Sequence, residues 1–248
     1  MNDAYSGLAR AYEALFPVHP GTVAYLSRAG LGPGGRILDV GCASGAHPRA
    51  FAAAGFRAEG IDPSEAMIEA ARAASAPGPH PGTEIPSYRR AGMLDLDRLC
   101  PPASRDAVTC LGNTLPHLRD EGEVEDFLGQ ARTVLVPGGF LVLQFLNYRR
   151  ILAERPDRLP RLEAGAWMFE RSYRYGNGYV EFDTRLSDRA GRVLSEGSVR
   201  LLPLTADRVA DRAERRGFRV AALESGWDGE PFDPDSSPLV LLRFASYD

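Results

Sequence analysis

The chain of 248 residues contains no lysine, because all 29 of its basic side chains are arginine. Without a lysine amine, catalysis through a lysine Schiff base is excluded. The three cysteines, Cys42, Cys100 and Cys110, are too few and too widely spaced for a disulfide scaffold or a structural zinc site. No pair of histidines or cysteines has the spacing of metal ligands, so we predict that the protein binds no metal.

Long apolar runs and excess positive charge are also missing. The chain has no run of about 18 apolar residues, and its first residues do not show a basic segment followed by an apolar one. A net charge of −4 and a pI of about 5.7 exclude a strong attraction to nucleic acid or anionic membranes. We therefore expect a cytoplasmic protein that binds neither. The length suits one large α/β domain, with or without a small insertion.

Residues 36–72 read as a strand, a glycine turn, a helix, a second strand, an acidic residue and a helix. The short apolar run at 37–40 is typical of a strand buried in a parallel sheet. Gly41 and Gly45 let the backbone turn sharply and approach a ligand, and unpaired N–H groups follow at the start of the helix. The second strand ends in Asp62, about 20 positions further on, where a carboxylate accepts hydrogen bonds from ribose hydroxyls. This spacing indicates an adenosine-type cofactor.

The turn itself distinguishes between cofactors. A loop that binds pyrophosphate has G-x-G-x-x-G, whereas this chain has D-V-G-C-A-S-G and lacks the third glycine. Asp39 before the turn would repel a pyrophosphate but suits an ammonium or sulfonium group. In this segment the chain resembles the class I S-adenosylmethionine-dependent methyltransferases, whose first motif is an acidic residue followed by G-x-G-x-G. Ala43 stands at the middle glycine, where we expect it to avoid positive φ.

The resemblance continues, in the family's order, over residues 36–152. EGIDPSEAMIEAAR is similar to the second strand and helix, RRAGMLDL to the end of the third strand, DAVTCLGNTLPHL to the fourth and VLVPGGFLVLQFLNYRRIL to the fifth. It implies a doubly wound seven-stranded sheet of order 3-2-1-4-5-7-6 with an antiparallel β insertion after strand five, and S-adenosyl-L-methionine as cofactor. The cofactor-binding residues that it implies are Tyr12, Asp39, Gly41, Cys42, Ala43, Gly45, Asp62, Pro63, Met67, Gly92, Met93, Leu94 and Leu111.

Asn113 and His117 follow directly on the fourth strand, at the sheet edge where open α/β folds bind ligands. An amide offers donors and an acceptor, and an imidazole with a pKa of about 6.5 suits proton removal near neutrality. Both are candidate catalytic residues. The alternative for His117 is a helix-entry residue bonded to the backbone. The chain is most similar to the glycine N-methyltransferase-like group of small-molecule methyltransferases, which implies substrate contacts at Asn113, Asn147, Tyr148, Arg171 and Arg174, with Arg149 as a further arginine that would hold an acidic substrate.

The remaining segments flank this core. We divide the chain into an N-terminal helical cap (1–30), the cofactor-binding core (31–152), the β insertion (153–204) and the last part of the core sheet (205–248). Residues 3–16 have helical periodicity, and the resemblance places Tyr5 and Tyr12 near the sulfonium; alternatively, they simply pack the helix onto the sheet. Residues 76–86 are a surface loop rich in proline and glycine. The G-N-G turn at 176–178 and Gly191 predict three antiparallel strands, used either as a lid or as a homodimer contact.

The expected function is methyl transfer from S-adenosylmethionine to nitrogen or oxygen of a small-molecule acceptor. Alignment of the reacting atoms is then the main task of the protein, and it can supply about 7–11 kcal/mol. An amine acceptor needs only to be bound neutral, whereas a hydroxyl acceptor benefits from His117 as general base. Two alternatives remain open: an NAD(P)-dependent oxidoreductase built on the same sheet, and a protein that binds the cofactor without turnover.

Overall fold

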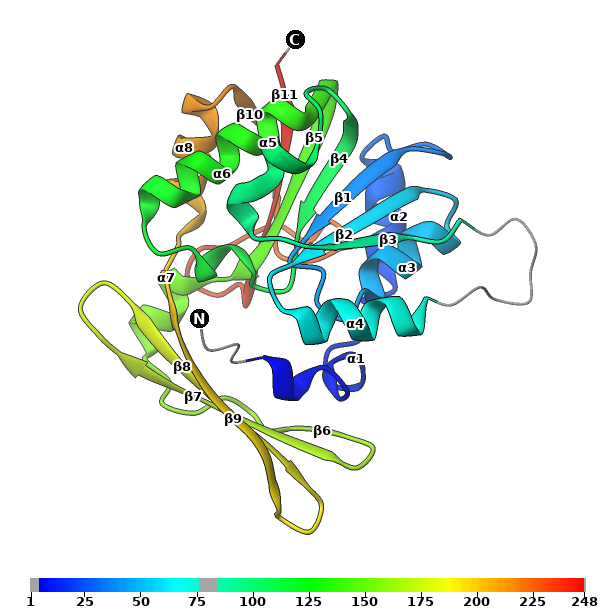
Figure 1. The fold of residues 1–248 in the computed structure, drawn as a ribbon. Coiled ribbons are helices and arrows are strands. Elements are labelled where there is room, and N and C mark those ends of the chain that lie inside the picture. The colour runs from blue at the N-terminus through cyan, green and yellow to red at the C-terminus, as the bar shows by residue number, and fades with distance from the viewer. Residues whose placement is uncertain (1–4, 76–83, 248) are drawn as a thin grey trace.

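The structure is a computed structural model that describes residues 5–75 and 84–247, so most of the predicted loop at 76–86, with His80, lies outside it. A seven-stranded sheet forms the core (Figure 1). Its strands are β1 (Arg36–Val40), β2 (Arg57–Asp62), β3 (Ser87–Arg90), β4 (Arg105–Cys110), β5 (Leu135–Leu146), β10 (Phe218–Glu224) and β11 (Leu239–Ser246). They lie in the order β10-β11-β5-β4-β1-β2-β3, with β11 antiparallel to β5 and β10, and the others parallel. The predicted strand order is confirmed.

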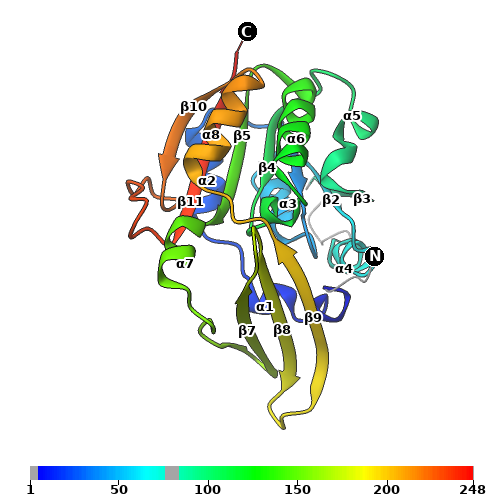
Figure 2. The same ribbon diagram turned by 90° about the vertical axis from the view of Figure 1, so that its left-hand side faces the viewer.

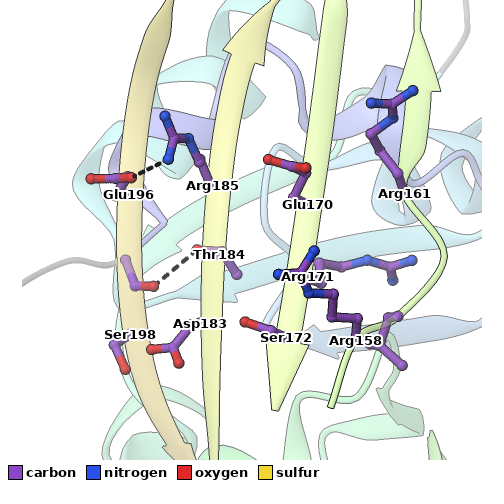
Figure 3. A pocket seen from close by; sticks show the side chains of 12 residues that line it. Arg158, Arg161, Glu170, Arg171, Ser172, Asp183, Thr184, Arg185, Glu196 and Ser198 are labelled. Atoms are coloured by element: carbon purple, nitrogen blue, oxygen red, sulfur yellow. Dashed lines mark hydrogen bonds and ion pairs between the residues drawn. The ribbon is translucent and has the colours of Figure 1, made fainter. Parts of the chain in front are cut away.

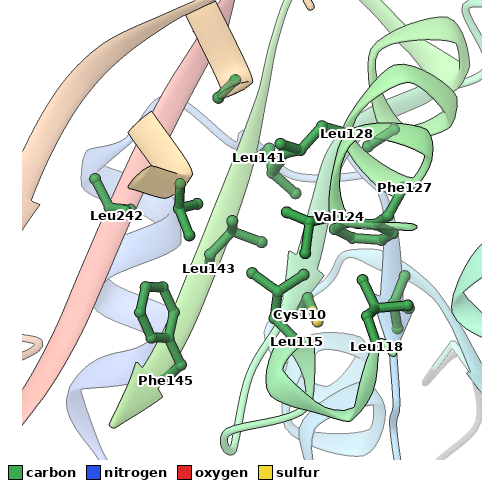
Figure 4. Close-up of a cluster of buried hydrophobic side chains, with 14 of the residues drawn as sticks. Cys110, Leu115, Leu118, Val124, Phe127, Leu128, Leu141, Leu143, Phe145 and Leu242 are labelled. Atoms are coloured by element: carbon green, nitrogen blue, oxygen red, sulfur yellow. The ribbon is translucent and has the colours of Figure 1, made fainter. Parts of the chain in front are cut away.

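Helices cover both faces of this sheet because successive strand residues point in opposite directions. In β1, Ile37 packs in a cluster with α2 (Gly21–Arg28) and α3 (Ala46–Ala53). Leu38 packs on the other face, in the cluster that includes α6 (Glu121–Val134) and α8 (Ala206–Arg215). Figure 4 shows part of this second cluster, where Val124 and Phe127 of α6 lie over Leu141 and Leu143 of β5. α4 (Glu65–Ala74) packs beside β3. The buried strands therefore end at one edge of the sheet, where the loops are free to form a site.

A second, antiparallel sheet lies beside this edge (Figure 2). It contains β6 (Leu162–Ala164), β7 (Trp167–Tyr175), β8 (Val180–Asp188) and β9 (Val193–Leu201). The prediction of three strands was wrong by one, because the short β6 pairs with β7 across a turn at Gly165. Alternate side chains of β7, among them Phe169 and Tyr173, are buried on the inner face, while Glu170 and Arg174 are exposed on the outer face.

The N-terminal segment lies between the two sheets (Figure 1). Instead of one helix over 3–16, it forms a 3-10 turn, η1 (Ser6–Leu8), and one turn of helix, α1 (Tyr12–Leu15). Leu8 and Leu15 are buried in a cluster with Ala43 and Met67 of the core and with Phe169 of the second sheet. Helical elements this short are not stable alone, so packing against both sheets decides their conformation.

Several further elements complete the chain. They are η2 (Met93–Asp95), α5 (Leu96–Leu99), η3 (Leu115–His117) and α7 (Tyr148–Glu154). α7 begins where the resemblance placed the end of strand five. The expected last helix and final antiparallel pair are present as α8 and as β10 with β11. Within 5–75 and 84–247, no helix combines the length and the apolar composition needed to cross a bilayer.

Candidate active site

The glycine turn after β1 is the first part of the site. Gly41 and Gly45 both have positive φ, at 74° and 82°. A Cβ on Gly41 would lie 2.3 Å from a side-chain carbon of Thr114, and one on Gly45 would lie 2.7 Å from the ring of Tyr88. The glycines are thus required by neighbouring side chains as well as by the turn. Ala43 also has positive φ, 47°, so the expectation that it avoids this region was wrong.

Asp62 explains why the turn holds Ala43 in that conformation. One carboxylate oxygen accepts a hydrogen bond from Ala43 N at 2.9 Å, and the other accepts one from Ser64 N at 2.9 Å. Charge-assisted bonds of this kind stabilise by about 1.5–3 kcal/mol each, which is of the same order as the cost of a left-handed alanine. Asp62 therefore links the turn after β1 to the start of α4 at the carboxyl end of β2.

Asp39 lies beside Asp62 and is only 2% exposed. Thr109 Oγ1 donates a hydrogen bond to it at 2.7 Å, and none of the described arginines forms an ion pair with it. Burial, with a further contribution from the charge of Asp62, raises the pKa of Asp39 to about 7. Close by in the turn, Ser44 Oγ is buried and has no hydrogen-bond partner among the described residues. A ligand that carries a positive charge and can form a hydrogen bond would complement the Asp39 carboxyl and the Ser44 hydroxyl.

The other predicted cofactor residues surround these acids. Tyr12 of α1 lies within electrostatic reach of Asp62 and Asp39, and burial raises the pKa of its hydroxyl. Met67 is buried against the N-terminal segment. Cys42 is buried in the turn beside α4, and the Leu111 carbonyl accepts a hydrogen bond from Thr114 Oγ1 at 2.6 Å. The remaining residues follow the ends of β2 and β3, where Pro63 O accepts from Arg90 and Gly92 N donates to Asp95, with Met93 and Leu94 in η2.

His117 lies in η3, just beyond the end of β4. Its Nδ1 lies 3.0 Å from the carbonyl oxygen of Thr114, which only accepts, so Nδ1 carries the proton. Nε2 is then the acceptor for the Tyr5 hydroxyl, 2.8 Å away. Burial lowers the pKa of His117, and the imidazole is neutral near pH 7. The structure shows the backbone bond that the alternative interpretation of His117 expected, and its role as a general base stays a prediction.

Asn113 and Tyr148 form a second polar pair in this region. Asn113 has positive φ, 65°, and its Nδ2 donates to the Tyr148 hydroxyl at 3.1 Å. Its Oδ1 accepts from Leu146 N at 3.0 Å, so the amide oxygen is already bonded to the backbone. Tyr148 and Tyr173 lie within electrostatic reach of each other, and burial raises the pKa of both, that of Tyr173 to about 12. Asn113 therefore orients an uncharged, aromatic wall.

Known proteins share this architecture. Residues 37–139 match a family model described as a methyltransferase domain. The chain is 32% identical to the ubiquinone biosynthesis O-methyltransferase of Bradyrhizobium sp. (strain ORS 278), over 45% of this chain and 40% of that protein. It is also 32% identical to rat (Rattus norvegicus) glycine N-methyltransferase, over 48% of this chain and 42% of that protein. The chain thus spans about two fifths of the length of these curated relatives.

A solved structure extends the likeness over the whole chain. The CcbJ methyltransferase from Streptomyces caelestis superposes with a TM-score of 0.82 at 21% identity, covering 99% of this chain and 98% of that one. The chain thus matches a methyltransferase domain over residues 37–139 and shares the fold of that structure along nearly its whole length. The resemblance inferred from its sequence motifs is confirmed, and no comparison supports an oxidoreductase. The cofactor of such domains is S-adenosylmethionine, whose positive charge and ribose hydroxyls fit the two carboxylates, and the orphaned Ser44 hydroxyl offers it a further hydrogen bond.

The three arginines predicted to hold an acidic substrate have different surroundings. Arg171 shares the inner face of β7 with Tyr173, and its Nε is buried without a hydrogen-bond partner among the described residues. Its NH2 group donates to Pro160 O at 2.7 Å, and Figure 3 shows its side chain extending towards the segment before β6. Arg174 lies on the outer face, paired with Asp183 at 2.7 Å, and is not part of the site.

Two other predicted contacts are structural. Arg149 is exposed and pairs with Asp235 at 2.9 Å. Asn147 is the N-cap of α7: its Oδ1 accepts from Arg150 N, and its Nδ2 donates to the carbonyls of Pro234 and Ser237. The prediction that Asn147 contacts substrate does not fit this geometry, because both polar atoms already bond to the protein.

Sequence reasoning did not assign Tyr173, Arg49 or Glu13 to the candidate site. Tyr173 lies on the same face of β7 as Phe169 and Arg171, because the three are every second residue of the strand. This period-two pattern is visible in the sequence. Arg49 of α3 donates to the Ser44 carbonyl at 2.9 Å and forms an ion pair with Glu13 of α1. No local sequence pattern predicts the ion pair between Arg49 and Glu13, because the two residues lie in separate helices.

Proposed function

We propose that the protein transfers a methyl group from S-adenosylmethionine to nitrogen or oxygen of a small-molecule acceptor. The supporting observation is the pair Asp39 and Asp62 at the ends of β1 and β2, with a buried Asp39 that lacks an ion-pair partner among the described residues. A pyrophosphate would be repelled there, whereas a sulfonium with a ribose diol is attracted. When bound, this cofactor supplies a methyl group that is already activated for in-line transfer.

The cofactor residues have distinct roles in this proposal. Asp62 accepts hydrogen bonds from the ribose hydroxyls, and Asp39 offers a negative charge to the cationic part of the molecule. Ser44 supplies the buried hydroxyl that lacks a partner within the described chain. Tyr12, which lies near both acids, contributes an aromatic face to the positive charge. The N-terminal segment covers this region and keeps water from the reacting atoms.

The acceptor site lies between the end of β4, the N-terminal segment and the inner face of β7. His117, Tyr5, Tyr148 and Tyr173 surround it, and none of them is charged near neutrality, because burial lowers the pKa of the imidazole and raises those of the phenols. An amine acceptor is therefore bound in its neutral form, and His117 accepts the proton that it loses. Asn113 fixes the position of Tyr148.

Arg171 points to the chemical class of the acceptor. Its guanidinium is partly buried, forms no ion pair with any described carboxylate, and keeps an unbonded Nε. Desolvation without a counter-ion lowers its pKa, which an anionic ligand would reverse. A carboxylate bound in a bidentate fork meets this need. We therefore propose an acceptor that carries a carboxylate beside the methylated amine or hydroxyl.

The second sheet serves, in this proposal, as a wall of the acceptor site, because its inner face packs on the N-terminal segment. A homodimer contact through the edge of this sheet stays a prediction, which sedimentation of the purified protein tests. The cytoplasmic location also stays a prediction.

Binding and turnover test the proposed function. We expect S-adenosylhomocysteine to bind in calorimetry and NAD to give no heat. S-adenosylhomocysteine should then form from S-adenosylmethionine with at least one member of a panel of amines, amino acids and hydroxylated metabolites, each offered with and without a carboxylate. Binding without any product would favour a non-catalytic protein, and binding of NAD alone would refute the proposal.

A further inference from the structure

Tyr5 lies at the junction of the cofactor and acceptor sites. Its hydroxyl bonds to His117 Nε2 at 2.8 Å, and the two rings lie 5.6 Å apart. Its electrostatic neighbours are Tyr12 and Asp62 on the cofactor side and Tyr173 on the acceptor side. Because Thr114 O holds Nδ1, Nε2 is the one ring nitrogen of His117 that can take a proton, and Tyr5 covers it.

We propose that Tyr5 relays the proton of the methyl acceptor to His117 Nε2. This inference rests on the proposed function. The acceptor nitrogen or oxygen forms its bond to the methyl carbon while the carbon–sulfur bond breaks and sulfur keeps the electron pair. The acceptor proton passes to Tyr5 Oη, and the Tyr5 proton passes to Nε2. The resulting imidazolium keeps its Nδ1–H on Thr114 O and later loses a proton to water.

A phenol suits this relay because it gives one proton while it takes another and does not need to ionise. Burial raises the pKa of Tyr5, so the side chain is neutral at neutral pH. A direct route to His117 would require Tyr5 to leave, which would break the part-buried hydrogen bond to Nε2 and expose the ring.

Packing of the N-terminal segment positions Tyr5 beside His117. The Tyr5 carbonyl accepts from Leu8 N at 2.9 Å at the start of η1, and Leu8 is buried in the cluster that joins both sheets. His117, by contrast, is fixed by the turn after β4. The proton path is therefore complete only when the N-terminal segment is seated, which couples closure of the site to its chemistry.

Nuclear magnetic resonance of histidine labelled with 15N tests the pair without an acceptor. In the complex with S-adenosylhomocysteine, we expect His117 to show a protonated Nδ1 and an unprotonated, hydrogen-bonded Nε2. Tyr5→Phe should move the Nε2 resonance towards that of a free nitrogen and raise the pH at which His117 titrates, because a bond that favours neutral imidazole is lost. Tyr247→Phe removes an exposed hydroxyl elsewhere and should change neither.

Single-turnover rates with whichever panel member is methylated test the relay itself. We expect Tyr5→Phe and His117→Gln each to slow transfer at least tenfold, and the double variant to be no slower than His117→Gln alone. Independent, multiplying effects, or an unchanged rate in Tyr5→Phe, would overturn the relay, as would a protonated Nε2 in the spectra. Failure of the wild-type chain to bind S-adenosylhomocysteine would instead refute the proposed function.

Discussion

The cofactor half and the acceptor half of the site are built in different ways. In the cofactor half, Asp39, the glycine turn and Asp62 come from one continuous stretch of two strands, and backbone N–H groups hold the Asp62 carboxylate. In the acceptor half, Tyr5, His117 and Tyr173 come from three distant elements and meet through side chains. A local motif therefore positions the carboxylates that we propose bind the methyl donor, whereas packing determines what lies opposite them.

The largest effect is expected in the cofactor half. Asp62→Ala should weaken binding of S-adenosylhomocysteine at least 100-fold, since two charge-assisted hydrogen bonds to ribose contribute about 1.5–3 kcal/mol each. The turn also loses the bond from Ala43 N, but the chain should still fold, as circular dichroism would show. Asp126→Ala, on an exposed face of α6, is the matched control. Unchanged affinity in calorimetry would contradict the assignment of Asp62.

The acceptor half should respond to Arg171 without any change at the cofactor. Arg171→Gln should raise KM for a carboxylated acceptor about 10- to 100-fold, because the bidentate pair is lost, and leave the affinity for S-adenosylhomocysteine as it was. Arg174→Gln removes an arginine of the same strand that already pairs with Asp183 on the outer face, and should alter neither value. Equal effects of the two substitutions in steady-state kinetics would remove Arg171 from the site.

The pH dependence of cofactor binding tests the role of Asp39 in the cofactor half. Its raised pKa of about 7 means that the empty site is about half protonated at neutral pH. A cationic ligand favours the carboxylate, so binding releases a proton, and affinity for S-adenosylmethionine should fall as pH drops below 7, by up to about tenfold per pH unit. Calorimetry in buffers of different ionisation enthalpy measures this release. Asp39→Asn should abolish it, and a release that persists in this variant would assign the proton elsewhere.

The smallest effect is expected for the ion pair that joins the N-terminal segment to α3 of the core. Glu13→Gln removes the ion pair with Arg49 and should speed dissociation of S-adenosylhomocysteine about two- to fivefold, as expected for a pair worth up to about 1 kcal/mol. Glu163→Gln, which removes the exposed pair with Arg161, is the control and should leave the rate unchanged. If stopped-flow traces of the two variants coincide, the Glu13–Arg49 pair does not hold the N-terminal segment closed.

Sequence reasoning succeeded where neighbours in the chain are neighbours in space. The strand order and Asp62 followed from local patterns, and the structure places Asp62 on the turn. It failed at Ala43, because the carboxylate that holds this residue at positive φ lies on the next strand. Asn147 was assigned to substrate because the sequence did not reveal its bonds to the loop before β11. This loop is distant in the chain, and its carbonyls accept hydrogen bonds from the Asn147 amide. Arg174 was assigned to the site because strand alternation separates the two faces of β7 but does not say which face is the inner one. The structure shows that Arg174 lies on the outer face.

The sequence by itself determined the class I methyltransferase core, since burial of apolar strands and the conformational demands of a glycine turn act over a few residues. Only the tertiary structure decided which side chains face the donor. The N-terminal segment is too short to fold alone, and its packing between two sheets brings Tyr5 onto His117, more than 100 residues away in the chain. Contacts of that separation depend on how surfaces fit, which no local pattern of residues encodes.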